Sequence, residues 1–394
     1  MSDQTIQERN PDRDPGSGTK VLRVITTAMG TFFSLCLIAV FCYNLVLSSG
    51  TKEAVSQQKA AGVAIMDKYD MYVNNAIADS LDGFPFIEVE KVYWLSDHDQ
   101  VAPEPNPECY GEVSSYEELL PILEQAEELL DGQTLAFTPD RPVWEGDSIH
   151  YYYDETILVI AWKEIVDNSV YTVAEVKVAH PSQFRRFLAG GEFGSDKQYV
   201  TTEMARSVNA VLASSGDFYG YRKYGAVVYE NELRRFEGES VDTCYITEDG
   251  DLLFTYRNEL ETEEEARAFI EENKVRFSLA FGPVLLDEGE IMVPGDYILG
   301  EVNGTYSRAA ICQWDKLHYL VVNTSQEQGY IKRHKVRAFA EFIQELGCET
   351  AYALDGGQTT AIVMDDELVT LPDYKTQRRI SDIIYFATAL PDGG

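Results

Sequence analysis

A carboxylate followed by two glycines stands near the C-terminal end of the chain, in the segment AYALDGGQTTAIVMDDELVT, residues 351–370. A short apolar run leads into Asp355, and Gly356 and Gly357 follow it directly. Glycines let the backbone come close to a ligand, and the carboxylate beside them can accept or donate a proton. The pattern favours a site for an oxyanion or a sugar phosphate, although Asp-Gly is also the most frequent hairpin turn.

Three segments further upstream place polar residues beside apolar runs. They are LASSGDFYG (212–220), FSLAFGPVLLDEGEI (277–291) and YSRAAICQWDKLHYLVV (306–322). With the glycine turn and the closing run RRISDIIYF (378–386), in this order and spacing, they resemble the phosphodiester glycosidase family. The resemblance extends from about Tyr171 to Leu390, which is more than half of the chain.

The resemblance implies an enzyme that cleaves sugar-1-phosphodiesters on the glycosidic side. Such a reaction needs a cation for the phosphate, a group that moves protons, and contacts that hold the sugar near an oxocarbenium-like transition state. Arg308 is expected to bind the phosphate, because a guanidinium can hold two phosphate oxygens and stays charged. Asp355 and Asp217 are expected to be the catalytic carboxylates, and a plain turn residue is the alternative for Asp217.

The resemblance also supplies a set of substrate-binding candidates around these three residues. Glycines allow close backbone approach, hydroxyl and amide groups can bond to sugar hydroxyls, and a further arginine can bind phosphate. The set is Ser215, Gly216, Gly356, Gly357, Gln358, Thr359, Thr360, Asn323 and Arg379. The alternative role for the two threonines is capping of the turn, and for Arg379 it is an ion pair.

The chain departs from the family pattern at several positions. Ser215 and Ala353 stand where the pattern has asparagine, and Gln358-Thr359 replaces a glycine and a serine. The family's Val-Asp-Gly-Arg is here the run VNTS, residues 322–325, so a carboxylate and an arginine are missing from the expected pocket. An amide keeps the shape of a carboxylate but transfers no proton. One alternative is therefore a pocket that binds a cell-envelope sugar-phosphate polymer without turnover, and another is a purely structural anchor protein.

The charge balance excludes some partners. The chain has 66 acidic and 32 basic residues and a formal net charge of −34. Such a surface repels nucleic acid and anionic lipid headgroups, so neither is expected to bind. The expected substrate is a sugar-1-phosphate-linked polysaccharide or glycolipid of a cell envelope, and an anionic substrate of this kind would need a locally basic pocket.

An apolar run near the N-terminus predicts a membrane anchor. Val24 to Leu47 holds about 24 residues without a charge, which is long enough to cross a bilayer as a helix. We expect an uncleaved signal anchor over 21–49, a disordered cytoplasmic tail over 1–20 and a helical stalk over 50–83. Slightly more basic residues precede the run than follow it, which favours a single-pass protein of the cell membrane with its C-terminal domain outside the cytoplasm.

The cysteines leave the redox state open. Four cysteines would lie outside the membrane: Cys109, Cys244, Cys312 and Cys348. They allow three disulfide pairings, but free buried thiols are favoured over any of these pairings. Neither a metal nor another cofactor is expected, because no Cys or His spacing suggests zinc.

The elements that must position these residues indicate an α+β fold with a mixed, mainly antiparallel sheet and packed helices. We expect an accessory subdomain over 84–165 and a phosphodiester glycosidase-like domain over 166–394. Hairpins are predicted over 225–236 and around Asp249-Gly250. An apolar stripe over 336–346, ended by Gly347, predicts the helix that feeds the strand entering Asp355.

Two capping boxes predict where other helices begin. Ser115 with Glu118, and Thr262 with Glu265, have the spacing of reciprocal side chain to backbone bonds at a helix start. Pro121 argues for a later start or a kink in the first of these helices. A further helix over 204–213 is expected to lead directly into a strand.

Overall fold

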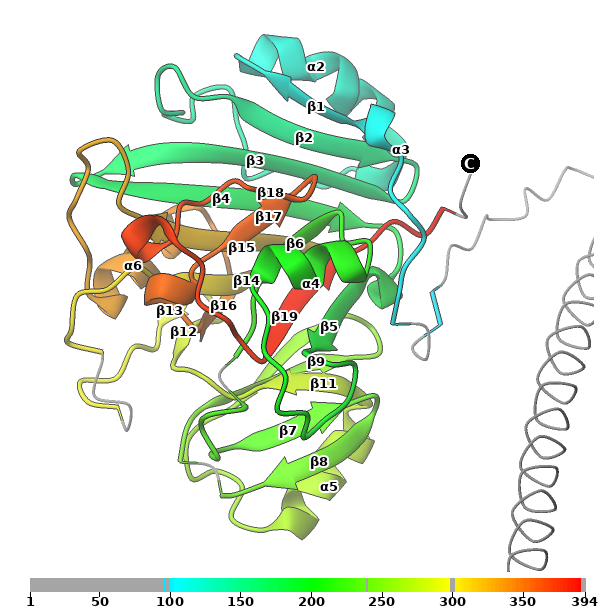
Figure 1. Ribbon diagram of the computed structural model, residues 1–394, viewed down its shortest axis with the longest axis vertical. Helices are drawn as coiled ribbons and strands as arrows, with labels where there is room; N and C mark the ends of the chain where they lie inside the picture. Colours follow the sequence, from blue (N-terminus) through cyan, green and yellow to red (C-terminus); the bar gives the residue numbers. More distant parts are fainter. Residues whose placement is uncertain (1–94, 97–99, 218, 239, 298–301, 391–394) are drawn as a thin grey trace, which may run out of the picture. The chain divides into compact units, whose positions relative to one another are not determined.

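The computed structural model describes residues 95–96, 100–217, 219–238, 240–297 and 302–390 (Figure 1). The tail, signal anchor and stalk expected over 1–83 lie outside these residues. No helix within the described ranges is long and apolar enough to cross a bilayer. The membrane anchor therefore stays a prediction from the sequence.

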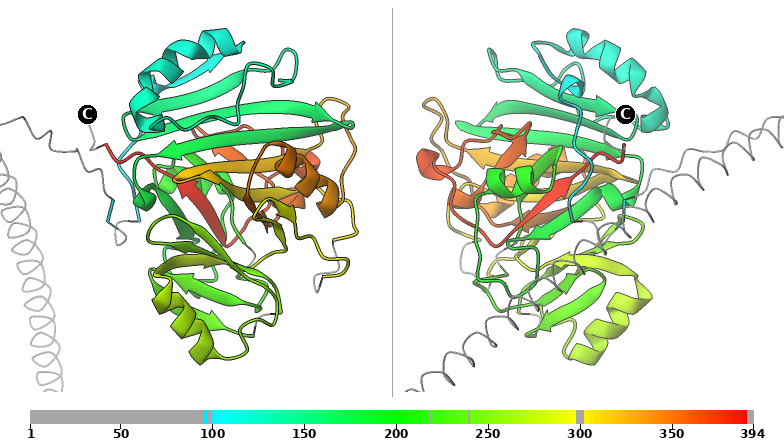
Figure 2. Two further views of the ribbon diagram at one scale, coloured as in Figure 1. Left: turned by 180° about the vertical axis from the view of Figure 1, so that it is seen from behind. Right: turned by 45° about the vertical axis from the view of Figure 1, so that its right-hand side comes forward.

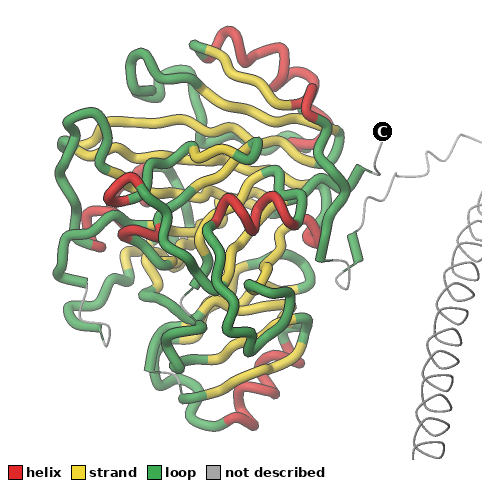
Figure 3. The backbone as a smooth tube through the Cα atoms, viewed as in Figure 1, coloured by secondary structure: helices red, strands yellow, loops and turns green. Residues whose placement is uncertain are grey.

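A nine-stranded antiparallel sheet carries most of the structure, and its strands dominate the view in Figure 3. Its two longest strands, β3 and β4, pair along their full length and are joined by Asp167-Asn168, both with positive φ as this tight turn requires. In spatial order the strands are β1 (Tyr110–Val113), β2 (Ile149–Asp154), β3 (Ile157–Val166), β4 (Ser169–Val178), β15 (His318–Ser325), β14 (Ala309–Asp315), β16 (Thr350–Leu354), β12 (Val284–Asp287) and β13 (Glu290–Ile291).

The boundary expected at 165/166 needs correction. It falls at the turn of the β3–β4 hairpin, where Val166 pairs with Ser169. Residues 100–165 therefore supply three outer strands of the main sheet and not a separate subdomain. Sequence alone could not show this, because β1 to β3 pair with each other locally and join the rest of the sheet only through β4.

A second, five-stranded antiparallel sheet packs on one face of the first. Residues such as Val159 and Ile311 from the large sheet meet Leu212 and Ile384 from the small one in a shared apolar core. In order its strands are β18 (Glu367–Leu368), β17 (Ile362–Met364), β6 (Leu212–Ser215), β19 (Asp382–Phe386) and β5 (Phe184–Leu188).

Helices cover the opposite face of the large sheet, as the two views of Figure 2 allow the reader to follow. They are α2 (Tyr116–Gln125), α3 (Glu127–Leu130) and α6 (Val336–Glu345). Because both faces are covered, all ten residues of β4 are buried. Its charged member Glu175 has partners inside, because this carboxylate accepts the backbone N–H groups of Ala136 and Phe137.

A smaller layer lies at the bottom of Figure 1 and has its own apolar core around Val228, Tyr245 and Ile270. The predicted hairpins over 225–236 and around Asp249-Gly250 are both confirmed here. The elements are β7 (Ala226–Tyr229), β8 (Glu232–Phe236), β9 (Thr243–Thr247), β10 (Leu252–Thr255), α5 (Glu263–Glu272) and β11 (Val275–Leu279).

Local helix signals are mostly confirmed. Thr262 and Glu265 form a complete capping box before α5, and Ser115 accepts the N–H of Glu118 at the start of α2. Pro121 lies inside α2, so the alternative that this helix begins only after the proline was wrong. Gly347, at φ 96°, ends the region of α6 as predicted.

Two other expectations change. The helix expected over 204–213 is α4 (Thr201–Ser207), and four residues separate its end from the start of β6. Every pairing between the described strands is antiparallel, so the expected mixed sheet is not found among them. The cysteines at 109, 244, 312 and 348 are free thiols. Four short 3-10 turns complete the chain: η1 (Pro107–Cys109), η2 (Pro181–Gln183), η3 (Gly357–Thr359) and η4 (Asp373–Lys375).

Candidate active site

The residue Asp355 follows β16 directly and is fixed through its backbone by the neighbouring sheet. The Ser215 hydroxyl donates to the carbonyl of Asp355 at 3.0 Å, and the Asp355 N–H donates to the carbonyl of Gly216 at 3.1 Å. Ser215 and Gly216, expected to contact substrate, therefore hold the loop that carries Asp355. The end of β6 and the end of β16 are tied together at this point.

The two glycines after Asp355 let a second segment pass close by. A Cβ atom on Gly356 would lie 2.5 Å from the carbonyl oxygen of Ser307, so no other residue fits without a shift. The N–H of Gly357, at φ 65°, donates to that same carbonyl at 2.8 Å. Because Arg308 follows Ser307, this packing brings its side chain to the same place as Asp355.

A cavity of about 290 Å³ opens at this junction and gathers charged groups from four segments. Asp355 lines it with three arginines, Arg222, Arg308 and Arg378. Arg378 donates to the Asp355 carboxylate at 3.0 Å, and this arginine side chain is 41% exposed. Asp355 is the one carboxylate among the described residues that line the cavity. Its charge balance therefore favours an anionic ligand, in a chain that is strongly acidic overall.

Aromatic rings and backbone carbonyls hold these arginines in place. The Arg308 guanidinium donates to the carbonyl of Gly304 at 2.7 Å and lies 5.3 Å from the centre of the Tyr306 ring. The Arg222 guanidinium lies 4.5 Å from the centre of the Phe281 ring. These contacts fix the position of each guanidinium beside the cavity.

The floor of the cavity is apolar and includes residues of α6. Val336 and Phe339 contribute from that helix, and Ala353 from β16. Burial raises the pKa of the Tyr297 phenol, which also lines the cavity and accepts the N–H of Asp242 at 2.6 Å. A small apolar floor below a few convergent polar groups is typical of a small-molecule site.

Some of the substrate-binding candidates do not reach the cavity. Gln358 lines it, but Thr359 and Thr360 are buried, and the Thr359 hydroxyl caps the turn by donating to the carbonyl of Gly356 at 2.7 Å. Arg379 is exposed outside the cavity and donates to the carbonyl of Gln198 at 3.3 Å.

Asn323 faces the wrong way for its expected role. It pairs with Ala309 across the sheet and shares a face with Val321, which packs in the core between the two sheets. Its amide is fully buried and has no hydrogen-bond partner among the described residues. Because side chains alternate along a strand, the neighbour Thr324 faces the cavity side, where its hydroxyl accepts the Arg308 N–H at 2.7 Å.

Asp217 is also removed from the cavity. Its side chain is fully buried and its carboxylate accepts the Arg186 guanidinium at 2.9 Å, together with the N–H groups of Tyr219 at 2.7 Å and Ala280 at 2.9 Å. The expected placing of Asp217 opposite Asp355 on one ligand is therefore not what the structure shows. Every oxygen of Asp217 already has a partner, which fits a structural role.

Arg186 holds a second carboxylate in the same buried cluster. Its guanidinium lies 2.8 Å from Asp382, and all three side chains are fully buried. Burial raises the pKa of Asp382 to about 8, with the nearby Asp217 adding to the rise and Arg186 opposing it. One arginine faces two carboxylates, so the cluster holds a proton more readily than an exposed aspartate does.

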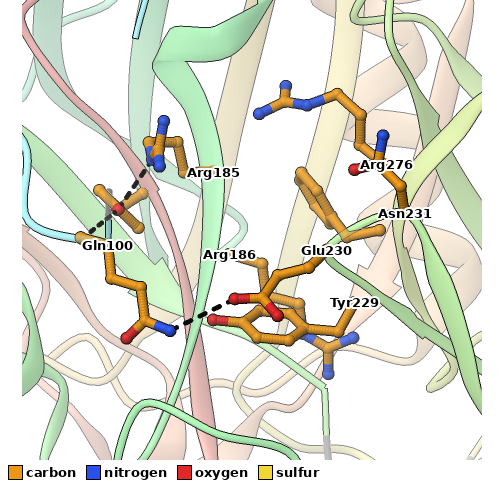
Figure 4. A pocket seen from close by; sticks show the side chains of 9 residues that line it. Gln100, Arg185, Arg186, Tyr229, Glu230, Asn231 and Arg276 are labelled. Atoms are coloured by element: carbon orange, nitrogen blue, oxygen red, sulfur yellow. Dashed lines mark hydrogen bonds between the residues drawn. The ribbon is translucent and has the colours of Figure 1, made fainter. Parts of the chain in front are cut away.

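A second hollow lies on the other side of Arg186 and is shown in Figure 4. Gln100, Arg185, Tyr229 and Glu230 surround it, and the Gln100 amide donates to Glu230 at 3.5 Å. Its volume of about 40 Å³ has room for about one water molecule, so it cannot take a sugar.

Sequence reasoning missed two arginines that matter to these sites. Arg222 lines the cavity, and Arg186 neutralises the buried cluster. Arg222 stands in the run YGYRKYG, which begins one residue after the SGD motif, and a cation between tyrosines was a usable signal. Arg186 lies on β5, far from either aspartate in the sequence, and no local pattern marks it.

Comparison with known proteins gives one family and distant structural likenesses. Residues 208–387 match the family model described as phosphodiester glycosidase. The catalytic domain of zebrafish N-acetylglucosamine-1-phosphodiester alpha-N-acetylglucosaminidase, auto-inhibited by its pro-peptide, is similar at a TM-score of 0.49 and 15% identity, over 71% of this chain and 88% of that one. A hypothetical protein from Synechocystis is similar at a TM-score of 0.44 and 15% identity, over 61% and 64%. No curated protein matches the chain.

Proposed function

Because residues 208–387 belong to the phosphodiester glycosidase family, we propose that the chain hydrolyses sugar-1-phosphodiester linkages in the cavity around Asp355. The observation that carries the proposal is the meeting of Asp355 with Arg222, Arg308 and Arg378 on one cavity wall. The arginines supply positive charge where a phosphate must bind, and the carboxylate can take up a proton beside them.

The reaction follows from these groups. Water attacks the anomeric carbon of the sugar, and the bond from that carbon to the phosphate oxygen breaks with its electron pair on the phosphate. Asp355 takes the proton that the attacking water loses. Arg308 and Arg222 stabilise the charge on the departing phosphate monoester, as a proton donor does for an alcohol leaving group. Arg378 positions Asp355 through their 3.0 Å bond.

The proposed setting is a cell envelope. The apolar run over 24–47 supports a signal anchor with the catalytic domain outside the cytoplasm. A polysaccharide or a glycolipid joined through a sugar-1-phosphate is the proposed substrate.

Release of free sugar by the full chain tests the proposal. The substrates are a panel of nitrophenyl-type and uridine-diphosphate-linked sugar-1-phosphodiesters, and the variants are Asp355→Asn and Arg308→Ala. We expect the wild type to release sugar from at least one substrate. The Arg308 variant should lose about a hundredfold to a thousandfold in kcat/KM. Absence of sugar release by the wild type from the whole panel would refute the proposal.

A specific observation favours a second candidate, binding without turnover. Asp217 lies outside the cavity, so the pair of carboxylates typical of glycoside hydrolysis is reduced to Asp355 among the described lining residues. In that case the same sugars bind saturably to the wild type and not to Arg308→Ala, and no product forms. Failure of both binding and release would refute this candidate as well.

A further inference from the structure

Four segments around the cavity are basic although the whole chain is acidic. Together they hold ten Lys or Arg residues and a single acidic one, Asp373, whereas the whole chain has 32 basic and 66 acidic residues. The segments are 219–224, 302–308, 329–337 and 372–379. Three of the ten are the arginines that line the cavity. The others extend the positive charge beyond it.

Gln198 brings two of these segments, 219–224 and 372–379, together. Its backbone carbonyl accepts from Arg379 at 3.3 Å, and its side chain accepts the Tyr221 hydroxyl at 2.6 Å. Arg222 and Arg378 line the cavity. Lys223 and Arg379 each stand next to one of these lining arginines, and both are exposed.

The buried carboxylate of Asp373 joins segment 372–379 to segments 302–308 and 329–337. It accepts the Ser307 hydroxyl at 2.7 Å and the Arg333 guanidinium at 3.0 Å. Ser307 lines the cavity, and so does Val336. Three exposed cations stand near these residues in the sequence: Lys335 and Arg337 adjoin Val336, and Lys375 stands two residues after Asp373.

Most of the outer cations are not used within the fold. Lys332 pairs with Asp167 and Arg333 pairs with Asp373. Lys223, Lys335, Arg337 and Lys375 make no ion pair with any residue that the structure describes. Exposed cations on segments that line an arginine-containing cavity make the local potential more positive than the net charge of the chain alone would give.

We propose that these cations form a track for a polyanionic glycan, one that carries further phosphate groups beyond the linkage bound at Asp355. This inference rests on the proposed function of the cavity. The cavity arginines bind the phosphate at the bond to be broken, so the outer cations contact a substrate only if its charge continues beyond that bond. A neutral glycan would gain nothing from Lys335, Arg337 or Lys375.

A bilayer with anionic headgroups is the competing partner. Ile331 and Tyr374 are 67% and 78% exposed and stand beside Lys332 and Lys375, as residues at a membrane interface do. However, each of the four basic segments also supplies a residue that lines the cavity. A flexible chain can follow such a surface into the cavity, whereas a flat bilayer reaches only its rim. The geometry therefore favours the chain.

Binding of long-chain inorganic polyphosphate to the full chain, held in phosphatidylcholine nanodiscs, tests the track. The track variant is Lys335→Gln/Arg337→Gln/Lys375→Gln. Its control, Arg206→Gln/Arg267→Gln/Lys316→Gln, makes the same change in net charge at exposed ion pairs elsewhere. We expect the track variant to bind about tenfold or more weakly and to lose about two units from the slope of log affinity against log salt. The control should stay within about twofold of the wild type.

Turnover separates this inference from the proposed function. The track variant should keep the wild-type kcat and KM on a short nitrophenyl-type substrate, which does not reach the outer cations. Loss of turnover on that short substrate would place the three residues in the cavity itself and overturn the track. Equal polyphosphate binding by the track variant and the wild type would overturn it too. Polyphosphate binding that follows the track, without turnover by any form, would sink the enzyme proposal alone.

Sucrose-loaded vesicles with about one-third phosphatidylglycerol test the bilayer. We expect them to pellet no more protein than vesicles of phosphatidylcholine alone. Pelleting that depends on the anionic lipid and is lost in Ile331→Ser/Tyr374→Ser, which still binds polyphosphate, would assign the rim to a lipid surface and overturn the glycan track.

Discussion

Two arginine–aspartate clusters lie close together in this fold and differ in what they can do. In the first, Asp355 meets Arg378 on the wall of a cavity, and the arginine is 41% exposed. In the second, Arg186 binds Asp217 and Asp382, and all three side chains are fully buried. The first cluster can contact a ligand, whereas the charges of the second are paired with one another inside the fold. The same residue types are therefore accessible to a ligand in one place and stabilise the fold in the other.

The largest expected effect concerns the cation of the buried cluster. Arg186→Met leaves two buried acidic side chains, Asp217 and Asp382, without their cation. The free energy of unfolding should therefore fall by about 5 kcal/mol. Urea unfolding at neutral pH measures this. Arg378→Met makes the same change at the half-exposed cluster and should cost less than about 1 kcal/mol. Equal losses in the two variants would remove the distinction between the clusters.

Exchanging carboxylate for amide should separate activity from stability. Asp355→Asn keeps the shape but removes the proton acceptor, so sugar release should fall about a thousandfold while the unfolding free energy changes by less than about 1 kcal/mol. Asp217→Asn should show the reverse pattern, with lower stability and near-normal turnover per folded molecule. Measurements are kcat/KM and urea unfolding for both proteins. Loss of turnover in a stably folded Asp217→Asn protein would show that this carboxylate takes part in the reaction after all.

The two glycines after Asp355 should respond differently to alanine. Gly356→Ala forces the Ser307 carbonyl away from a Cβ that would lie 2.5 Å from it, and we expect a loss of about 2 kcal/mol together with lower turnover. In Gly357→Ala the added Cβ has no atom within 4 Å, so only the positive φ of 65° is unfavourable for alanine. We expect a loss of about 1 kcal/mol in the free energy of unfolding. Thermal or urea unfolding ranks the two variants. A greater loss at Gly357 would contradict the close approach of Ser307.

The last prediction concerns the dependence of stability on pH. The pKa of Asp382 is raised to about 8 in the folded state from an ordinary value of 3.8, chiefly by burial. The folded protein therefore binds this proton more tightly than the unfolded chain, so the contribution of Asp382 to stability is full below about pH 4 and is lost as the pH rises toward 8. Asp382→Asn removes this contribution, and the wild type minus variant difference in unfolding free energy should decline across that window. A difference that is constant or rising with pH would show that Asp382 is ionised in the fold.

Local patterns in the sequence predicted the elements that position the site. The box of Thr262 and Glu265, the hairpin at Asp249-Gly250 and the stripe before Gly347 all depend on residues a few positions apart, and each is confirmed. The convergence of Arg308 and Asp355 also followed from the family-like order of segments, since both stand at ends of neighbouring strands. Their chemical roles stay predictions.

What the sequence could not show depends on contacts between distant segments. Asp217 and Asp355 each stand beside a glycine at the end of a strand, and only Arg186, from a third strand, distinguishes the buried one. Asn323 was assigned to the cavity because its segment resembles a family motif, but the pairing of β15 between β4 and β14 turns its amide into the core between the sheets. Alternation along a strand fixes two faces without saying which one a ligand meets.

The segment Ser215-Gly216-Asp217 belongs to both clusters, since its first two residues hold the backbone of Asp355 and its third binds Arg186. This sharing sets the order in which a lineage can lose its properties. If the proposed function is correct, a single change at Asp355 would end the chemistry and leave the framework intact, so a receptor could descend from a hydrolase of this kind. A change in the triplet would damage the framework and the reaction together, so selection for the fold alone would also preserve the position of Asp355.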